Sequence, residues 1–428
     1  MTRTLQVSID ERTVGTLSEN RGIWSFEYDS SWTRDGYPLS PRLALSDKII
    51  EDTGTDRPVQ WFFDNLLPEE TARASLFASL PAKGGDAWDL LAQFGAESAG
   101  AITLLPPDAI QADAGLQPLP DDELDARIRA MPRIPLAAKA PKKMSLAGAQ
   151  QKLPVVVDDQ GKLFDPVGAY VSTHILKPDV LSEHYPSSAV NEWFCVRLAQ
   201  ELGLPVPPVL LRYVPALVYL IARFDREVRD GVVRRLHTLD AAQLLSLSAG
   251  AKYARSGVDA LIEVIDRCRV KASARLAVFR WSVFNALIGN ADAHLKNLSL
   301  FASRSGYAIA PHYDLVSTAA WSRPELAGAG EATWPHIELS FPIGTARSFD
   351  TLSVADVIAF GEALGVTKTV ASQELKRLVE AIVPAAENIL AEYESRTDVP
   401  PAMRASQLKM LRAILYLPIR SMRNQLKQ

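Results

Sequence analysis

The alternation of apolar and polar residues near the start of the chain predicts a small antiparallel sheet. Between about residues 59 and 94 the apolar residues instead recur at helical spacing. We therefore expect residues 1–105 to form a small α+β domain. The alternating apolar residues are Leu5, Val7 and Ile9, followed by Trp24, Phe26 and Tyr28.

Prolines are concentrated in residues 106–143. A proline fixes φ and removes a backbone donor, so such a run favours a linker with at most one short helix, near residues 121–130. The prolines of this segment are Pro106, Pro107, Pro118, Pro120, Pro132, Pro135 and Pro141.

Beyond residue 144 the pattern predicts a sheet-rich lobe followed by a helical lobe. A helix over residues 188–202 interrupts the strands, and the pattern is mostly helical from residue 239 onward. We predict an α+β, bilobal, protein-kinase-like fold, with a mixed sheet lobe over residues 144–226 and a helical lobe over residues 227–428. The strands are expected at residues 153–157, 170–177, 209–213 and 217–223.

Charge and cysteine content exclude several classes of protein. Among 428 residues, 46 Lys and Arg face 50 Asp and Glu, so the net charge of −4 gives no strong global attraction to nucleic acid or anionic membranes. The two cysteines form no C-x-x-C motif, which indicates cytosolic thiols. No stretch resembles a signal peptide or a membrane span. We expect a cytoplasmic protein with no membrane partner.

The segment 289–298 carries the most informative polar residues. Asp292 and Asn297 are five positions apart, as are the proton-accepting Asp and the Mg²⁺-binding Asn of a kinase catalytic loop. Asp314 follows a predicted strand and could hold Mg²⁺ on the phosphates. Each signal has an ordinary alternative, because an Asp-x₄-Asn spacing arises by chance and an Asp at a strand end often forms a turn or a helix cap.

Upstream residues supply the other parts of a phosphate site. Small residues around Gly148 would let backbone N–H groups approach phosphate oxygens, although a plain turn has the same composition. Lys177 ends a predicted strand and could neutralise phosphate charge, paired with Glu192 on the next helix. Glu192 could instead interact only with the helix dipole. Residues 223–226 end a strand where a hinge between the lobes would lie.

The order of these parts favours ATP-dependent phosphoryl transfer, since it is the order found in protein kinases. A metal-dependent hydrolase using His294 and His312 beside Asp292 and Asp314 is an alternative. That alternative leaves Lys177 and the loop at Gly148 without a role.

These motifs resemble those of the HipA family of serine/threonine protein kinase toxins from bacterial type II toxin–antitoxin systems. The matches run in order from about residue 60 to residue 320. They are Phe63–Glu69, Ser145–Lys152, Thr173–Lys177, Asn191–Trp193, Arg223–Arg226, Asp292–Asn297 and Tyr313–Asp314.

The resemblance implies a role for each matching residue. Asp292 would be the catalytic base, Lys177 the phosphate clamp, and Asn297 and Asp314 the Mg²⁺ ligands. Ser145 would be phosphorylated by the kinase itself, which ejects the loop and stops nucleotide binding. Ala222 stands where the family often has Glu. The residues expected to contact ATP are Ser145, Ala147, Gly148, Ala149, Lys177, Ala222, Phe224, Asp225 and His294.

The resemblance also implies partners. Family members phosphorylate an aminoacyl-tRNA synthetase, which halts translation and causes dormancy, and they bind a small helix-turn-helix antitoxin (HipB-like) that contacts operator DNA. The basic tail over residues 401–428 could assist at the DNA or simply be a solvated helix face. A small-molecule kinase of the antibiotic-modifying type and an inactive kinase fold that only binds remain as alternatives.

Overall fold

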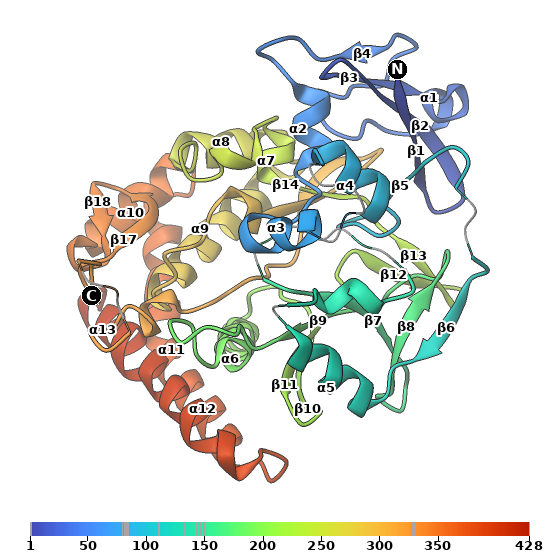
Figure 1. Cartoon of the computed structure of the whole chain (residues 1–428). Helices are drawn as coiled ribbons and strands as arrows, with labels where there is room; N and C mark the ends of the chain where they lie inside the picture. The colour runs from blue at the N-terminus through green and yellow to red at the C-terminus, as the bar shows by residue number, and fades with distance from the viewer. Residues whose placement is uncertain are drawn as a thin grey trace.

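The computed structural model describes residues 2–78, 80, 85–109, 112–131, 133–142, 144, 148, 150–326, 328 and 330–427. It is an α+β structure with a small N-terminal domain, a sheet lobe and a helical lobe (Figure 1). The α+β, bilobal arrangement predicted from the sequence is confirmed. The boundaries at residues 105, 143 and 226 remain a prediction.

The N-terminal domain is a five-stranded antiparallel sheet in the order β4-β3-β2-β1-β5, with helices packed on it. The predicted alternation is confirmed, because Leu5, Val7 and Ile9 are all buried in its core. The strands are β1 (Arg3–Ile9), β2 (Arg12–Asn20), β3 (Ile23–Tyr28), β4 (Ile50–Glu51) and β5 (Ile102–Leu105). The helices are α1 (Ser30–Asp35), α2 (Pro58–Asp64), α3 (Glu70–Ala78) and α4 (Ala87–Phe94).

The sheet lobe contains a six-stranded sheet in the order β10-β11-β9-β7-β8-β6. Every neighbouring pair runs antiparallel, so the sheet is antiparallel and not mixed as expected. Its strands are β6 (Gly115–Pro118), β7 (Leu153–Val157), β8 (Leu163–Val167), β9 (His174–Pro178), β10 (Val209–Tyr213) and β11 (Leu217–Ala222). The helices are α5 (Asp121–Ala130) and α6 (Ser188–Glu201).

The proline-rich segment 106–143 does more than connect two domains. It supplies β6, the edge strand beside β8, and the predicted short helix, which is α5 (Figure 1). Leu124 and Ile128 of α5 are buried in the core of the sheet lobe. Pro118 ends an edge strand and Pro120 precedes the first turn of α5, so neither occupies a position where a backbone donor is needed.

The helical lobe surrounds the buried helix α9. Its helices are α7 (Ala241–Leu244), α8 (Val258–Arg267), α9 (Lys271–Leu287), α10 (Val354–Ala363), α11 (Lys368–Ser395), α12 (Pro401–Ile414) and α13 (Arg420–Gln425). Three small antiparallel sheets accompany them. Their strands are β12 (Arg226–Arg229) with β13 (Val232–Arg235), β14 (Thr238–Asp240) with β15 (Ser299–Ser303) and β16 (Gly306–Ile309), and β17 (Glu338–Ile343) with β18 (Ala346–Ser348).

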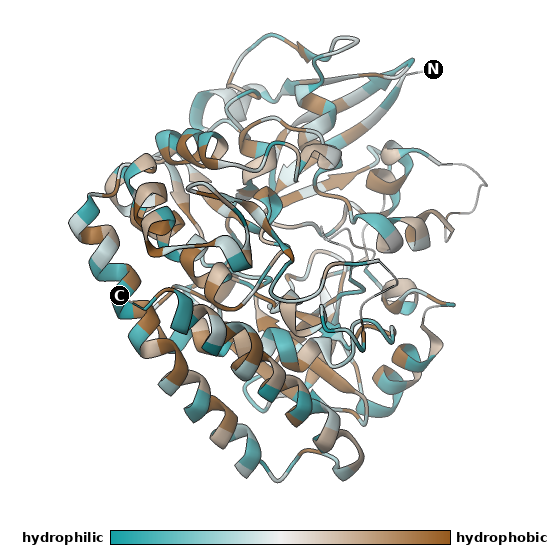
Figure 2. Cartoon of the chain, turned by 90° about the vertical axis from the view of Figure 1, so that its left-hand side faces the viewer, coloured by the Kyte–Doolittle hydropathy of each residue, from teal (hydrophilic) through white to brown (hydrophobic). Residues whose placement is uncertain are grey.

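The long helices of this lobe are amphipathic. Hydrophobic and hydrophilic bands alternate along them, as in helices that bury one face (Figure 2). Part of the basic tail pairs with acids of α11, since Arg412 lies 2.7 Å from Glu394 and Arg420 lies 2.6 Å from Glu387. Within the described residues, no helix combines the length and apolar character needed to cross a membrane.

Candidate active site

The loop that carries Asp292 begins where α9 ends. Gly289 has φ +66°, and a Cβ there would lie 2.6 Å from Ala319 and 2.7 Å from Pro418, so the turn needs glycine. The loop is held by its own polar groups. Asn290 Oδ1 accepts from the Asp292 amide at 3.0 Å, and Asn297 Nδ2 donates to the Asp292 carbonyl at 2.7 Å. The predicted pair Asp292 and Asn297 is therefore brought together.

The Asp292 carboxylate faces outward from this loop. Its Oδ1 accepts a 2.5 Å hydrogen bond from the Tyr253 hydroxyl and lies 3.7 Å from His294 Nε2. Desolvation raises the pKa of Asp292 and outweighs the opposing effects of His294 and Tyr253. A raised pKa makes this carboxylate a stronger base, which suits removal of a proton from a hydroxyl group.

Buried Lys177 and Glu192 form one ionic cluster with Asp314, which is partly exposed. Lys177 Nζ donates to both Glu192 oxygens, at 2.8 and 2.9 Å, and to Asp314 Oδ1 at 3.0 Å. The predicted pairing of Lys177 with Glu192 is thus present. Burial alone would raise the pKa of Asp314, but the charges of Lys177 and Lys152 outweigh it and the carboxylate stays ionised. Asp314 also has φ +55°, a left-handed conformation that is uncommon outside glycine.

A second lysine lies at the small-residue loop. Gly148 has φ +103°, and a Cβ there would lie 2.4 Å from Lys152 Nζ, so the ammonium approaches the loop backbone closely. Burial and the charge of Lys177 lower the pKa of Lys152 to about 8. Two ammonium groups beside one backbone loop suit a polyphosphate. Three residues predicted to contact ATP, Ser145, Ala147 and Ala149, lie outside the described residues.

The predicted hinge, residues 223–226, follows β11. Ala222 pairs with His174 at the end of the sheet, and the Phe224 ring stacks on Tyr313, with centroids 5.5 Å apart. Among the described residues, no hydrogen bond involves the Phe224 amide or carbonyl. A flat aromatic surface beside unpaired backbone groups suits a purine base. Asp225 differs, because its buried carboxylate already accepts from Arg223 at 2.7 Å and from the Gly100 amide at 2.6 Å.

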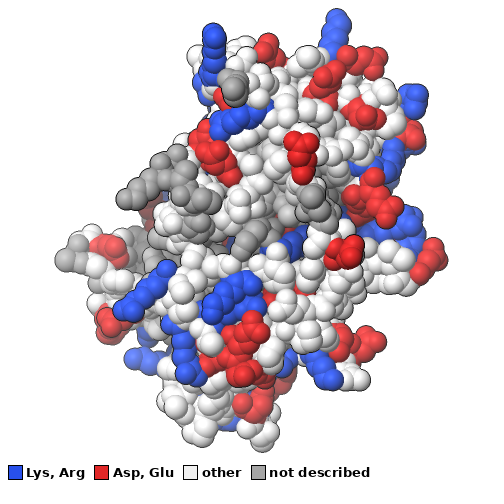
Figure 3. Space-filling model, turned by 45° about the vertical axis from the view of Figure 1, so that its right-hand side comes forward, with Lys and Arg blue, Asp and Glu red and all other residues white. Residues whose placement is uncertain are grey.

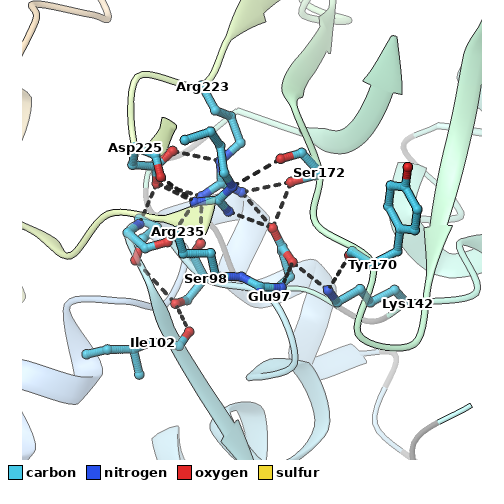
Figure 4. Close-up of polar contacts among 12 residues, drawn as sticks. Glu97, Ser98, Ile102, Lys142, Tyr170, Ser172, Arg223, Asp225 and Arg235 are labelled. Atoms are coloured by element: carbon cyan, nitrogen blue, oxygen red, sulfur yellow. Dashed lines mark hydrogen bonds and ion pairs between the residues drawn. The ribbon is translucent and has the colours of Figure 1, made fainter. Parts of the chain in front are cut away.

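A buried carboxylate from the N-terminal domain anchors this hinge (Figure 4). Glu97 lies 2.9 Å from Arg223, 2.8 Å from Arg226, 2.6 Å from Lys142 and 3.5 Å from Arg235. Burial would raise the pKa of Glu97, but these cations lower it well below its ordinary value. The hinge, the N-terminal domain and the segment before the Gly148 loop therefore share one ionic cluster.

Comparison with known proteins identifies the family. The model of the HipA N-terminal domain matches residues 5–105, and that of the HipA-like C-terminal domain matches residues 144–387. The chain belongs to the HipA-like kinase family.

Two relatives and one solved structure match this HipA-like kinase over nearly their whole length. The serine/threonine-protein kinase toxin HipA of Shewanella oneidensis is 30% identical, covering 91% of this chain and 90% of that protein. The solved complex of HipA, HipB and operator DNA from the same organism matches with a TM-score of 0.77 and 27% identity, covering 98% of this chain and 99% of that HipA chain. The protein Y4mE of Sinorhizobium fredii is 33% identical, covering 91% of this chain and 92% of its own.

The two histidines considered as metal ligands have different surroundings in this HipA-like kinase. His294 lies beside Asp292, whereas buried His312 stacks on Trp281, with centroids 6.4 Å apart. Burial lowers the pKa of His312 to about 4. Within the described part of the chain, no group of three or more His, Cys, Asp or Glu side chains could hold a metal ion.

Sequence reasoning assigned no role to Lys152, Glu97, Tyr253 or Lys296. Lys152 is the last residue of the Ser145–Lys152 motif, so the sequence did contain a signal for it. Glu97 and Tyr253 stand outside the quoted motifs. Lys296 lies inside the Asp292–Asn297 loop, but its partner Asn65 is 231 positions away, and no local pattern reports such a contact.

Proposed function

We propose that this chain is an ATP- and Mg²⁺-dependent serine/threonine protein kinase that acts as the toxin of a toxin–antitoxin system. The observation that carries the proposal is the placement of Lys177 between Glu192 and Asp314, beside the loop that joins Asp292 to Asn297. This set of groups matches the recurring parts of a protein-kinase site.

Asp292 is the proposed catalytic base. It accepts the proton of a substrate serine or threonine hydroxyl while that oxygen bonds to the γ-phosphorus of ATP. The bond from this phosphorus to the β–γ bridging oxygen breaks, and ADP leaves. Lys177 and Lys152 neutralise the phosphate charge, which is the main contribution a protein makes to phosphoryl transfer.

The residues available for Mg²⁺ fit the ion. Asn297 uses its amide nitrogen to hold the Asp292 carbonyl, which leaves its side-chain oxygen for a cation. Asp314 stays ionised, and oxygen ligands of this kind are those Mg²⁺ prefers. Bound there, Mg²⁺ would neutralise charge on the phosphates.

The nucleotide would extend from the Gly148 loop to the hinge. Phe224 and Ala222 would contact adenine mainly through the backbone, and His294 would lie near the phosphates. Asp225 would act by holding the hinge in place. Ser145 is proposed as an inactivating autophosphorylation site, because a phosphoserine adds nearly two negative charges to a loop shaped for phosphates.

The proposed partners follow from the family. The Shewanella relative was solved with HipB and operator DNA, which supports a HipB-like helix-turn-helix antitoxin for this chain. Acidic and basic residues are interspersed on the face shown in Figure 3, and the net charge is −4, so the antitoxin would supply the DNA contact. An aminoacyl-tRNA synthetase is the proposed substrate, and its phosphorylation would inhibit translation and induce dormancy.

The test is transfer of labelled γ-phosphate from ATP-Mg²⁺ to bacterial lysate, with label located by mass spectrometry. Wild-type chain should label Ser145 and one lysate protein. Asp292→Asn should lower both by at least about 100-fold, because the base is lost. Ser145→Ala should lose the label on the kinase chain but keep the label on the lysate protein. Transfer to a small molecule alone would instead identify an antibiotic-type kinase, and nucleotide binding without transfer would identify a binding module.

A further inference from the structure

The segment that follows α2 in the N-terminal domain contacts the catalytic loop directly. Lys296, which lies between Asp292 and Asn297 in the sequence of that loop, is buried. Its Nζ donates to Asn65 Oδ1 at 2.7 Å and to the Asn65 carbonyl at 3.1 Å, and it lies 3.0 Å from Glu69 Oε1. The N-terminal domain therefore supplies most of the groups that hold this lysine.

Glu69 reaches the proposed base by a second route. Its Oε2 lies 2.5 Å from Lys252 Nζ, and this ammonium lies 5.0 Å from the centre of the Tyr253 ring. The Tyr253 hydroxyl donates to Asp292 at 2.5 Å. One carboxylate thus contacts both segments that border Asp292, the catalytic loop and the segment around Tyr253.

The same segment also contacts the phosphate loop. The Glu69 amide donates to the Gly148 carbonyl at 3.3 Å, and Pro68 forms a β-bridge with Gly148. Glu69 is therefore linked to both loops that would face the triphosphate. These contacts fix its position relative to the phosphate loop and the base together.

Glu69 is buried, so loss of its charge would leave nearby buried cations without their closest carboxylate partner. The residue is 8% exposed, and the charges of Lys296 and Lys252 hold its pKa below the ordinary value despite burial. Asp240 Oδ2 is farther from Lys296 Nζ, at 3.5 Å, so Glu69 is the closer of its two carboxylate partners. Removal of one member of a buried ion pair leaves its partner uncompensated. The loop would then shift to let Lys296 reach water.

We propose that Glu69 is a positioning residue that sets the place of Asp292 through Lys296 and through Lys252 with Tyr253. The inference rests on the proposed function, in which Asp292 is the catalytic base. A displacement of about 1 Å at such a base can cost roughly 100-fold in rate. ATP contacts at the hinge lie on other elements and would keep their geometry.

The test compares Glu69→Gln with Glu70→Gln in the full-length chain. Glu70 is the matched control, because its side chain is 60% exposed and its one described partner is Lys252 at 3.3 Å. For Glu69→Gln we expect kcat to fall about 10- to 100-fold while the KM for ATP changes less than about twofold. Glu70→Gln should keep kcat within about twofold of wild type.

Two further variants separate positioning from stability. Glu69→Asp keeps the charge and should recover part of kcat. Glu69→Gln combined with Lys296→Met removes both members of the Glu69–Lys296 pair, which should recover part of the thermal stability lost in Glu69→Gln but leave kcat low. Recovery of wild-type kcat in the double variant would show that Glu69 only neutralises charge, and would overturn the proposal.

Asp292→Asn distinguishes failure of this inference from failure of the proposed function. If the Asp292→Asn chain were active, Asp292 would not be the catalytic base, and the proposed function would be wrong. An inactive Asp292→Asn chain beside a fully active, folded Glu69→Gln chain would reject only the positioning role of Glu69.

Discussion

At the scale of single residues, burial and charge oppose each other throughout the site. Lys177 is 6% exposed, and burial alone would lower its pKa. The charges of Asp314 and Glu192 outweigh this effect, so the pKa lies above its ordinary value. The lysine therefore remains charged at physiological pH, which a phosphate clamp requires.

His237 shows the opposite result, because among the described residues no carboxylate compensates its burial. Its Nε2 bonds the Leu39 carbonyl at 3.0 Å, and burial lowers its pKa to about 4. As the pH falls, His237 becomes protonated near pH 6.5 in the unfolded chain but only near pH 4 in the folded chain. The free energy of unfolding therefore decreases between about pH 6.5 and pH 4. At pH 5 the loss from His237 is about 2 kcal/mol.

Urea unfolding at pH 7 and pH 5 tests this prediction with His237→Gln. The variant should lose about 2 kcal/mol less stability than wild type between the two pH values, because its side chain does not titrate. His184→Gln is the control at an exposed position and should behave like wild type. An unchanged pH dependence in His237→Gln would show that His237 is not held neutral.

The residues that could be predicted are those whose neighbours in sequence already indicate their role. Lys177 at a strand end, Glu192 on the following helix and the Asp292–Asn297 spacing belong to this group, and the structure brings their groups into contact. Glu97 and Arg223 are 126 positions apart, and their contact depends on how two domains pack. No periodicity within either segment encodes that packing.

At the scale of elements, the segment 106–143 shows what composition can and cannot predict. Prolines reduce backbone hydrogen bonding, which is typical of linkers, but they also fit an edge strand and the start of a helix. β6 and α5 use them in those two places. The helix near residues 121–130 could be predicted, whereas its burial against β7 and β11 could not.

We predict that Leu124→Ala in α5 destabilises the chain by about 2–5 kcal/mol, because Leu124 is fully buried and its loss leaves a cavity. Leu116→Ala on neighbouring β6 is the control, since Leu116 is 37% exposed, and it should cost less than about 1 kcal/mol. Urea unfolding of both variants measures the difference. Two equally small changes would mean that this segment is only a connection.

At the scale of the whole molecule, the N-terminal domain and the helical lobe share one apolar core, which also includes α6 and residues of β10 and β11. This core runs from Leu5 and Phe63 through Trp193 to Leu411, and the sheet lobe has a second core of its own. The polar cluster around Glu97 joins the same domain to the hinge (Figure 4). The N-terminal domain is therefore built into the kinase and is not an appended module.

Glu97→Gln tests this integration. Glu97 is 1% exposed and lies among four cationic side chains, so removal of its charge should cost about 3–5 kcal/mol of stability. ATP affinity should also fall, because Arg223 and Arg226 flank the backbone of Phe224 and would move to find other partners. Thermal unfolding and calorimetric titration with ATP measure the two effects.

The control for Glu97→Gln is Glu51→Gln, an exposed glutamate of the same domain on β4, which should change neither quantity. A large loss of stability with unchanged ATP affinity would mean that the cluster joins the domains without shaping the hinge. If the N-terminal domain holds the nucleotide site in place, Glu97→Gln should lose both stability and ATP affinity. Glu51→Gln should then behave like wild type. That result would mean that domain packing and nucleotide binding both depend on the buried Glu97 carboxylate.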